Sequence, residues 1–170
     1  MVSKSLLRRR VVHAVVAALL AAPISVVPAR AEVAVDDMAA ARTEPLGIVT
    51  RNGRRAFKVE VMRSDADRAR GLMFRKVMAP DRGMLFDFEQ VQPVSMWMKN
   101  TYLPLDMVFI RPDGTVARVA ADTEPLSTKV IPSGEPVLAV LELNAGTAEK
   151  LGIRTGDRVE HALFKARGGR

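Results

Sequence analysis

Aromatic and polar side chains gather in one short stretch of the chain, residues 93–110. This stretch holds the only tryptophan and the only tyrosine of the 170 residues. Indole and phenol rings offer flat apolar faces with one hydrogen-bonding group each, and amide, carboxylate and ammonium groups add donors and acceptors. The residues predicted to bind a ligand are Trp97, Lys99, Asn100, Tyr102 and Asp106, joined from elsewhere in the fold by Arg75 and Glu142. Such a set predicts a pocket for a small molecule or a glycan, without a cofactor.

The same stretch also fits a purely structural interpretation. Trp97 would then be a core residue, and Asn100 would cap a turn. Asp106 is a single acid in an otherwise apolar segment, so it needs a partner if it is buried. That partner could be Lys99 or Arg75. The residues alone leave the binding and the structural interpretations open.

Two carboxylates in apolar segments suggest a hydrolytic alternative. Burial raises the pKa of a carboxyl group, and Asp106 and Glu142 at a suitable separation could act as acid and base in an envelope hydrolase or lyase. The simpler interpretation gives each of them one structural salt bridge. The leading hypothesis is therefore a non-catalytic binding or interaction module with no catalytic residue. A third hypothesis, a structural or chaperone-like accessory domain, predicts no pocket and an exposed apolar patch.

Nucleophilic and metal chemistries find less support. After residue 31 the chain has one histidine, His161, no cysteine and no Gly-x-Ser-x-Gly motif, so neither a serine triad nor a zinc site is predicted. Thioether sulfur is a ligand for Cu(I), and Met96 and Met98 would share one face of a strand. Core packing produces the same spacing, because methionine fills gaps in cores. Met96 and Met98 therefore form only a minor alternative metal site.

The first 31 residues have the features of a secretory signal peptide. Basic residues at positions 8–10 precede an apolar segment, residues 11–22, and Ala29-Arg30-Ala31 fits an A-x-A cleavage site. The apolar segment is shorter than the roughly 20 residues of a membrane span. We expect export to the periplasm or the cell exterior after cleavage near Ala31, with membrane contact only for export. The general and the twin-arginine routes both remain open.

The basic composition of the chain is concentrated in this first segment. Five of the 26 Lys and Arg residues and none of the 19 Asp and Glu residues lie in residues 1–31, which leaves 21 basic against 19 acidic side chains. Nucleic-acid binding needs a clustered basic surface, so no nucleic-acid partner is predicted, while a protein partner stays open. The chain has no cysteine, so packing without disulfides must stabilise the fold.

Short apolar segments between turn residues must position the side chains of the predicted binding site. Residues 46–50 and 56–61 flank Asn52-Gly53, a strong hairpin signal. Further strands are expected at residues 84–88, 94–99, 105–110, 115–120, 137–143 and 158–164. One short helix begins after Ser64, with Ala66 and Ala69 expected to face the core, and a second begins near Asn144.

The spacing of these segments is typical of a mainly β fold. We predict a compact antiparallel β-sandwich or small barrel of about seven or eight short strands with two short helices. Residues 122–136, which contain three prolines, would form a long surface loop. The domain limits follow as a linker or N-terminal arm at 32–45, one β-rich domain at 46–164 and a disordered tail at 165–170.

Several sequence blocks together resemble a known family. The blocks are Gly71-Leu72-Met73-Phe74-Arg75, Gly83-Met84-Leu85-Phe86, Met96-Trp97-Met98-Lys99-Asn100-Thr101, Pro104-Leu105-Asp106, Leu141-Glu142-Leu143-Asn144-Ala145-Gly146 and Gly156-Asp157. In combination they resemble domain-of-unknown-function family 192, a bacterial and archaeal family, over roughly residues 46–164. The resemblance implies a compact all-β sandwich-like fold, often in secreted proteins. It implies no assigned activity and transfers no catalytic residue.

Overall fold

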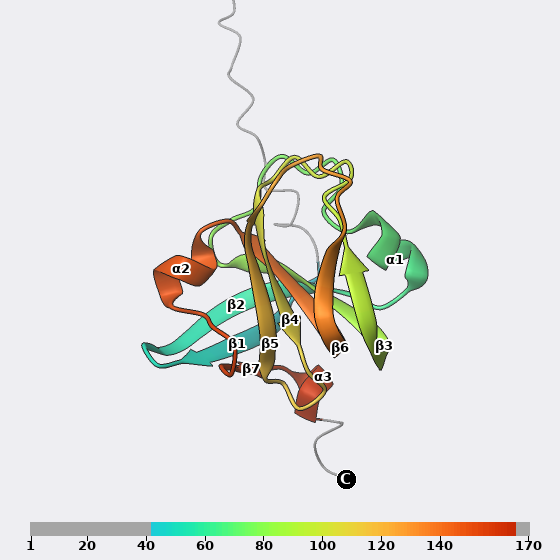
Figure 1. Ribbon diagram of the computed structural model, residues 1–170. Helices are drawn as coiled ribbons and strands as arrows, with labels where there is room; N and C mark the ends of the chain where they lie inside the picture. Colours follow the sequence, from blue (N-terminus) through green and yellow to red (C-terminus); the bar gives the residue numbers. More distant parts are fainter. Residues whose placement is uncertain (1–41, 166–170) are drawn as a thin grey trace, which may run out of the picture. The chain divides into compact units, whose positions relative to one another are not determined.

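Strands in one curled sheet make up most of the chain that the computed structural model describes, residues 42–165 (Figure 1). The chain divides into two compact units, and all described residues lie in the second, Val33–Arg170. The strands are β1 (Glu44–Thr50), β2 (Gly53–Met62), β3 (Arg82–Met96), β4 (Leu105–Ile110), β5 (Val116–Thr123), β6 (Ile131–Asn144) and β7 (Arg158–Glu160). The helices are α1 (Asp65–Arg70), α2 (Thr147–Leu151) and α3 (Ala162–Lys165). The predicted signal peptide, most of the predicted arm and the tail after Lys165 lie outside the described residues.

The sheet has the strand order β5-β4-β6-β3-β2-β1-β7. All neighbouring pairs are antiparallel except β2 and β3, which run parallel. A parallel pair needs a crossover connection, which α1 and residues 71–81 supply. The prediction of a mainly β fold with about seven strands is confirmed. The expectation of wholly antiparallel pairing is wrong for this one pair, and the described residues contain a third short helix.

The sheet curls far enough to bring its two edge strands, β5 and β7, into contact at one end. Thr115, just before β5, forms a bridge with Arg158 of β7. The backbone N–H of Val159 donates to the carbonyl oxygen of Gly114 at 2.8 Å.

The predicted hairpin connects β1 and β2. Thr50, the last residue of β1, lies opposite Gly53, the first residue of β2, and Gly53 has a φ of 98°. A tight turn of this kind favours glycine at a positive φ.

Both faces of the central strands are buried, so alternate residues enter two apolar layers. Every residue of β4 is buried. Val108 and Ile110 enter the layer that Ala148 of α2 and Phe164 of α3 help to close. Met107 and Phe109 enter the opposite layer, which Leu72, Met78 and Met98 cover from the connecting loops. Burial on both faces explains why these strands read as nearly continuous apolar runs.

Bulges allow β3 and β6 to extend well beyond the central sheet. The register shifts between Asp87 and Gln92 and again between Pro93 and Ser95. Two segments predicted as separate strands therefore belong to β3. Much of the predicted long loop at 122–136 is strand, because Pro132 and Pro136 pair with β3 next to these bulges. Proline is tolerated where a bulge already interrupts the ladder of hydrogen bonds.

Candidate functional site

Trp97 lies at the mouth of a groove between α1 and β3. Its side chain follows the last residue of β3 and is 52% exposed. The groove has a volume of about 200 Å³ and is lined by Arg68, Ala69, Phe86, Phe88, Ser95, Met96 and Trp97. The interpretation of Trp97 as a core residue is therefore wrong. Ala69 is also exposed and forms part of the groove wall, so neither it nor Ala66 faces the core as expected.

A smaller cavity of about 30 Å³ shares the Trp97 wall and leads to Glu142. Lys99 and Thr101 also line it, together with the segment from Arg68 to Met73. A space of this size holds about one water molecule or one small polar group. We call the groove and this cavity together the Trp97 site.

Glu142 is the chemically distinctive residue of the Trp97 site. It is 4% exposed and lies in β6 directly opposite Met84 of β3 and Met107 of β4. Burial raises the pKa of its carboxyl group to about 8. Within residues 42–165 no donor forms a hydrogen bond with this carboxyl and no basic side chain pairs with it. A carboxyl in this state is protonated at neutral pH and can donate one hydrogen bond to a ligand.

Helix α1 supplies the other wall of the groove, and specific contacts hold it there. Ser64 caps the helix by accepting from the backbone N–H of Asp67 at 3.1 Å. Arg68 Nη1 donates to the carbonyl oxygen of Asp87 at 2.6 Å, which ties α1 to β3. The helix ends at Gly71, where a Cβ atom would lie 2.9 Å from the Phe86 ring. Glycine therefore permits the close approach that brings residues 71–73 to the small cavity.

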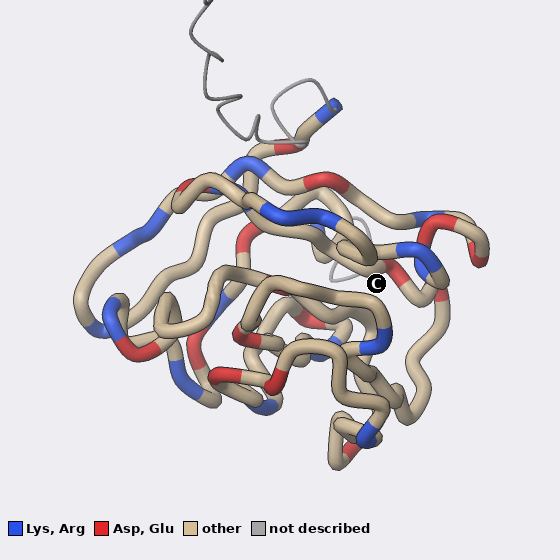
Figure 2. Tube along the Cα trace, turned by 90° about the horizontal axis from the view of Figure 1, so that it is seen from above, with Lys and Arg blue, Asp and Glu red and all other residues tan. Residues whose placement is uncertain are grey.

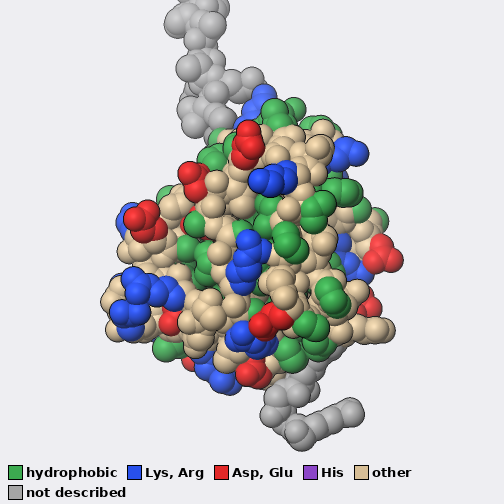
Figure 3. Space-filling view, in the orientation of Figure 1, with side chains coloured by type: hydrophobic (Ala, Val, Ile, Leu, Met, Phe, Trp, Pro, Cys, Tyr) green, Lys and Arg blue, Asp and Glu red, His purple; other side chains and the backbone are tan. Residues whose placement is uncertain are grey.

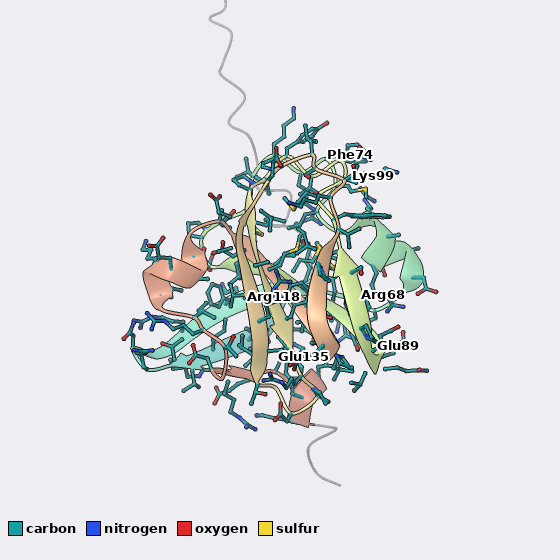
Figure 4. The ribbon with its side chains drawn as sticks, viewed as in Figure 1. Arg68, Phe74, Glu89, Lys99, Arg118 and Glu135 are labelled. Carbon is teal, nitrogen blue, oxygen red and sulfur yellow. The ribbon has the colours of Figure 1, made fainter. Side chains whose placement is uncertain are left out.

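Lys99, Asn100 and Tyr102 lie close together but have different roles. The Lys99 ammonium group lies 5.9 Å from the centre of the Trp97 ring, within the range of a cation–π contact. Asn100 is a positioning residue, since its carbonyl oxygen accepts from the Phe74 N–H at 2.8 Å. Tyr102 contacts the edge of Phe74, with ring centres 6.4 Å apart, and does not line the groove. Figure 4 shows Phe74 and Lys99 at the same end of the molecule, above Arg68.

Asp106 does not belong to the Trp97 site. It lies opposite Leu143, whereas Glu142 lies opposite Met107, so the Asp106 and Glu142 side chains point to opposite faces of the sheet. Asp106 is fully buried and accepts from the backbone N–H groups of Asp122 at 2.9 Å and Ala148 at 2.7 Å. The predicted pairing of Asp106 with Lys99 or Arg75 is therefore wrong. The facing pair of carboxyls that the hydrolase alternative requires is not formed.

Arg75 lies outside the Trp97 site, and the two methionines of the copper alternative line different hollows. Arg75 forms a bidentate ion pair with Glu60 of β2, with N–O distances of 2.6 and 2.9 Å. Met96 lines the Trp97 site, whereas Met98 lines a different hollow of about 430 Å³ beside Arg118. Residues 42–165 contain no group of three or more His, Cys, Asp or Glu side chains placed to hold a metal ion. Met98 is buried in the apolar layer against which Met96 also packs, which agrees with core packing of both side chains.

Three loops beside the Trp97 site carry residues at positive φ that sequence reasoning missed. Residues 71–79, 97–104 and 124–130, here called the loop cluster, each contain a non-glycine residue at positive φ: Phe74 at 65°, Asn100 at 57° and Leu126 at 63°. For bulky residues this conformation is a genuine outlier, and such strain gathers at functional sites. In Figure 1 these loops cross one another at the top of the sheet. The sequence gives no signal for the positive φ of Phe74 and Leu126, because neither Phe nor Leu favours this conformation.

Relief of this strain gives a first testable prediction. Leu126→Asn is expected to raise the free energy of unfolding by about 0.5–1 kcal/mol, because asparagine tolerates the left-handed region that leucine resists. Leu126 is exposed, so little packing is lost. Urea unfolding followed by circular dichroism measures the change. Val130→Asn, a substitution in the same loop without a positive φ, should not stabilise the fold, and equal gains in both variants would contradict the strain argument.

Comparisons with known proteins agree with this architecture. The model of the DUF192 family, described as "Uncharacterized ACR, COG1430", matches residues 47–161. No curated protein matches the chain.

Two solved structures are similar to the chain. One, from Sinorhizobium meliloti 1021, is described as a "putative transcription regulator"; it is 50% identical, with a TM-score of 0.70, and the match covers 72% of this chain and 95% of that one. The other, a protein of unknown function from Novosphingobium aromaticivorans DSM 12444, is 39% identical, with a TM-score of 0.69, and the match covers 70% of this chain and 85% of that one.

Proposed function

The chain belongs to the DUF192 family, and we propose that this member is an exported, non-catalytic ligand-binding protein. The observation that carries the proposal is the Trp97 site. An indole ring stands half-exposed at its mouth, and the buried carboxyl of Glu142 ends it without a hydrogen-bond partner among the described residues. A buried polar group that lacks a partner costs stability, so an unused donor beside a cavity favours a role in binding.

The chemistry of the Trp97 site favours a neutral, polar ligand group such as a sugar hydroxyl. A protonated carboxyl both donates and accepts, as a hydroxyl does, so the two groups are complementary. The flat Trp97 face suits an apolar ring face. At about 200 Å³ and 30 Å³, the groove and cavity lie below the usual size of a drug-sized pocket. The site therefore suits one small molecule or the terminal unit of a glycan.

Export is supported by the basic start, the apolar segment and the A-x-A site in residues 1–31, which lie outside the described residues. Within residues 42–165 no helix is long and apolar enough to cross a membrane. Expression of the full chain in a Gram-negative host, followed by fractionation and N-terminal sequencing, tests the proposal. Recovery of an uncleaved chain in the cytoplasm would contradict it.

The binding test uses the chain that remains after the proposed cleavage, residues 32–170. The match to the Sinorhizobium structure leaves only a small part of that crystallised chain uncovered, which indicates that this domain folds without a partner segment. Trp97 is the only tryptophan, so its fluorescence reports on the site itself. Titration with a panel of monosaccharides, envelope glycan fragments and small metabolites should give a saturable change for one ligand class.

Ala69→Leu is the variant that distinguishes the Trp97 site from other surfaces. The added side chain fills the groove, and the affinity for the ligand should fall at least about tenfold, a loss of about 1.4 kcal/mol. Ala66→Leu adds the same group to the same helix, away from the groove, and should leave the affinity unchanged. Calorimetry confirms the affinities. A flat response to the whole panel, or equal losses in both variants, would remove the proposed site.

A further inference from the structure

The loop cluster exposes an unusual share of the apolar side chains of the domain. Large hydrophobic residues that are exposed within residues 42–165 are Val49, Phe74, Val91, Trp97, Tyr102, Leu126 and Val130. Five of these seven belong to the loop cluster. Scattered exposed hydrophobic residues are normal on protein surfaces, but a concentration on neighbouring loops marks an interaction surface. Figure 3 shows hydrophobic side chains between charged ones at this upper end of the molecule.

Hydrogen bonds between the loops hold these side chains outward. The Phe74 N–H donates to the Asn100 carbonyl oxygen at 2.8 Å, and the Leu126 N–H donates to the Thr101 carbonyl oxygen at 3.0 Å. The Met98 N–H donates to the Ser127 carbonyl oxygen, also at 3.0 Å. These bonds join all three loops into one unit. Phe74 and Leu126 stay exposed at a backbone cost, and the ring contact of Phe74 is with Tyr102, which belongs to the same loop cluster.

The charges around these side chains are mainly positive. Lys76, Lys99 and Lys129 are exposed within the three loops, and Glu124 is the acidic residue there. The Arg75 charge is neutralised by Glu60. Over the trace as a whole, basic and acidic positions are interspersed, as seen from above in Figure 2. The loop cluster therefore combines protruding apolar side chains with a local excess of ammonium groups.

We infer that the loop cluster docks on the surface of an anionic phospholipid bilayer. The hollows of the domain described above are not lined by Phe74, Tyr102 or Leu126, so these side chains project outward rather than enclose a ligand. A protruding apolar group can insert into the boundary between headgroups and acyl chains, where aromatic side chains are favoured. The lysines then meet anionic phosphate groups. Docking of this kind does not depend on the identity of the ligand of the Trp97 site.

Sedimentation with vesicles tests the inference on residues 32–170. Vesicles that contain phosphatidylglycerol should bind the protein, whereas vesicles of phosphatidylcholine alone should bind it weakly. The double variant Phe74→Asn/Leu126→Asn removes the inserted groups and tolerates both positive φ values. Its partition coefficient for the anionic vesicles should fall at least about tenfold, given the apolar surface removed. Val91→Asn, an exposed apolar residue of β3 outside the loop cluster, is the matched control and should bind as the unaltered protein does.

The outcomes separate lipid docking from charge attraction alone and from self-association. Loss of binding in Lys76→Ala/Lys129→Ala, together with loss in the double asparagine variant, supports docking through both components. Binding that salt abolishes but that the double asparagine variant retains would overturn the inference, because charge alone would then account for it. Absence of binding to anionic vesicles would also overturn it. So would self-association that the double asparagine variant abolishes, since the loop cluster would then contact a second copy of the chain.

Discussion

Glu142→Gln is expected to remove a loss of stability that the native protein undergoes as the pH rises from about 5 to 8. The buried carboxyl has its pKa raised from 4.5 to about 8. In this window the folded state keeps a proton that the unfolded state has released, so the free energy of unfolding falls with rising pH. The contribution is about 1.4 kcal/mol per pH unit. Glutamine has nearly the same shape and no proton to lose, so the variant should lack this slope.

Urea unfolding at pH 5, 6.5 and 8 measures the difference between the two proteins. His161 acts in the opposite direction, because burial lowers its pKa below 6.5 and its stabilisation is lost as the pH falls. That contribution is common to both proteins and cancels in the difference. Glu149→Gln, a change on the exposed surface of α2, serves as the control and should keep the native slope. Parallel pH profiles for native protein and Glu142→Gln would show that a partner stabilises the carboxylate.

Asp106→Ala is expected to cost roughly 3–5 kcal/mol of stability, which is a large share of the total for a domain of this size. The carboxylate accepts two backbone N–H groups, from Asp122 and Ala148, and alanine would leave both without this partner, the Ala148 donor in a buried position. Asp106→Asn should be nearly as costly, because the amide nitrogen would face one of these donors. Denaturant unfolding at pH 7 gives the values.

The same variants decide between a structural and a functional role of Asp106. A structural residue changes the unfolding free energy and leaves the ligand affinity of the remaining folded protein intact. A residue of the binding site would reduce the affinity with a stability change below about 1 kcal/mol. The second result would contradict the assignment of Asp106 as the tie between β4, the end of β5 and α2.

Local chemistry was sufficient to predict much of the architecture. The alternation of apolar residues and the Asn52-Gly53 turn are local signals that involve residues two to four positions apart. The β1–β2 hairpin lies where these signals predict it. The single tryptophan in a polar stretch led to the prediction of a binding site; Trp97 lines a groove, and binding there stays a prediction. The parallel β2–β3 pair and the merging of two expected strands into β3 were not predictable, because bulges and crossovers depend on contacts distant in the chain.

Asp106 and Glu142 show most clearly what only the tertiary structure decided. Each is a single acid in an apolar strand, and their local sequences give no reason to treat them differently. Pairing between β4 and β6 places them on opposite faces. On one face Asp106 meets two backbone donors, and on the other Glu142 meets methionines and a cavity. Since a side-chain period of two makes register decide the face, one carboxyl became structural and the other became a candidate for binding.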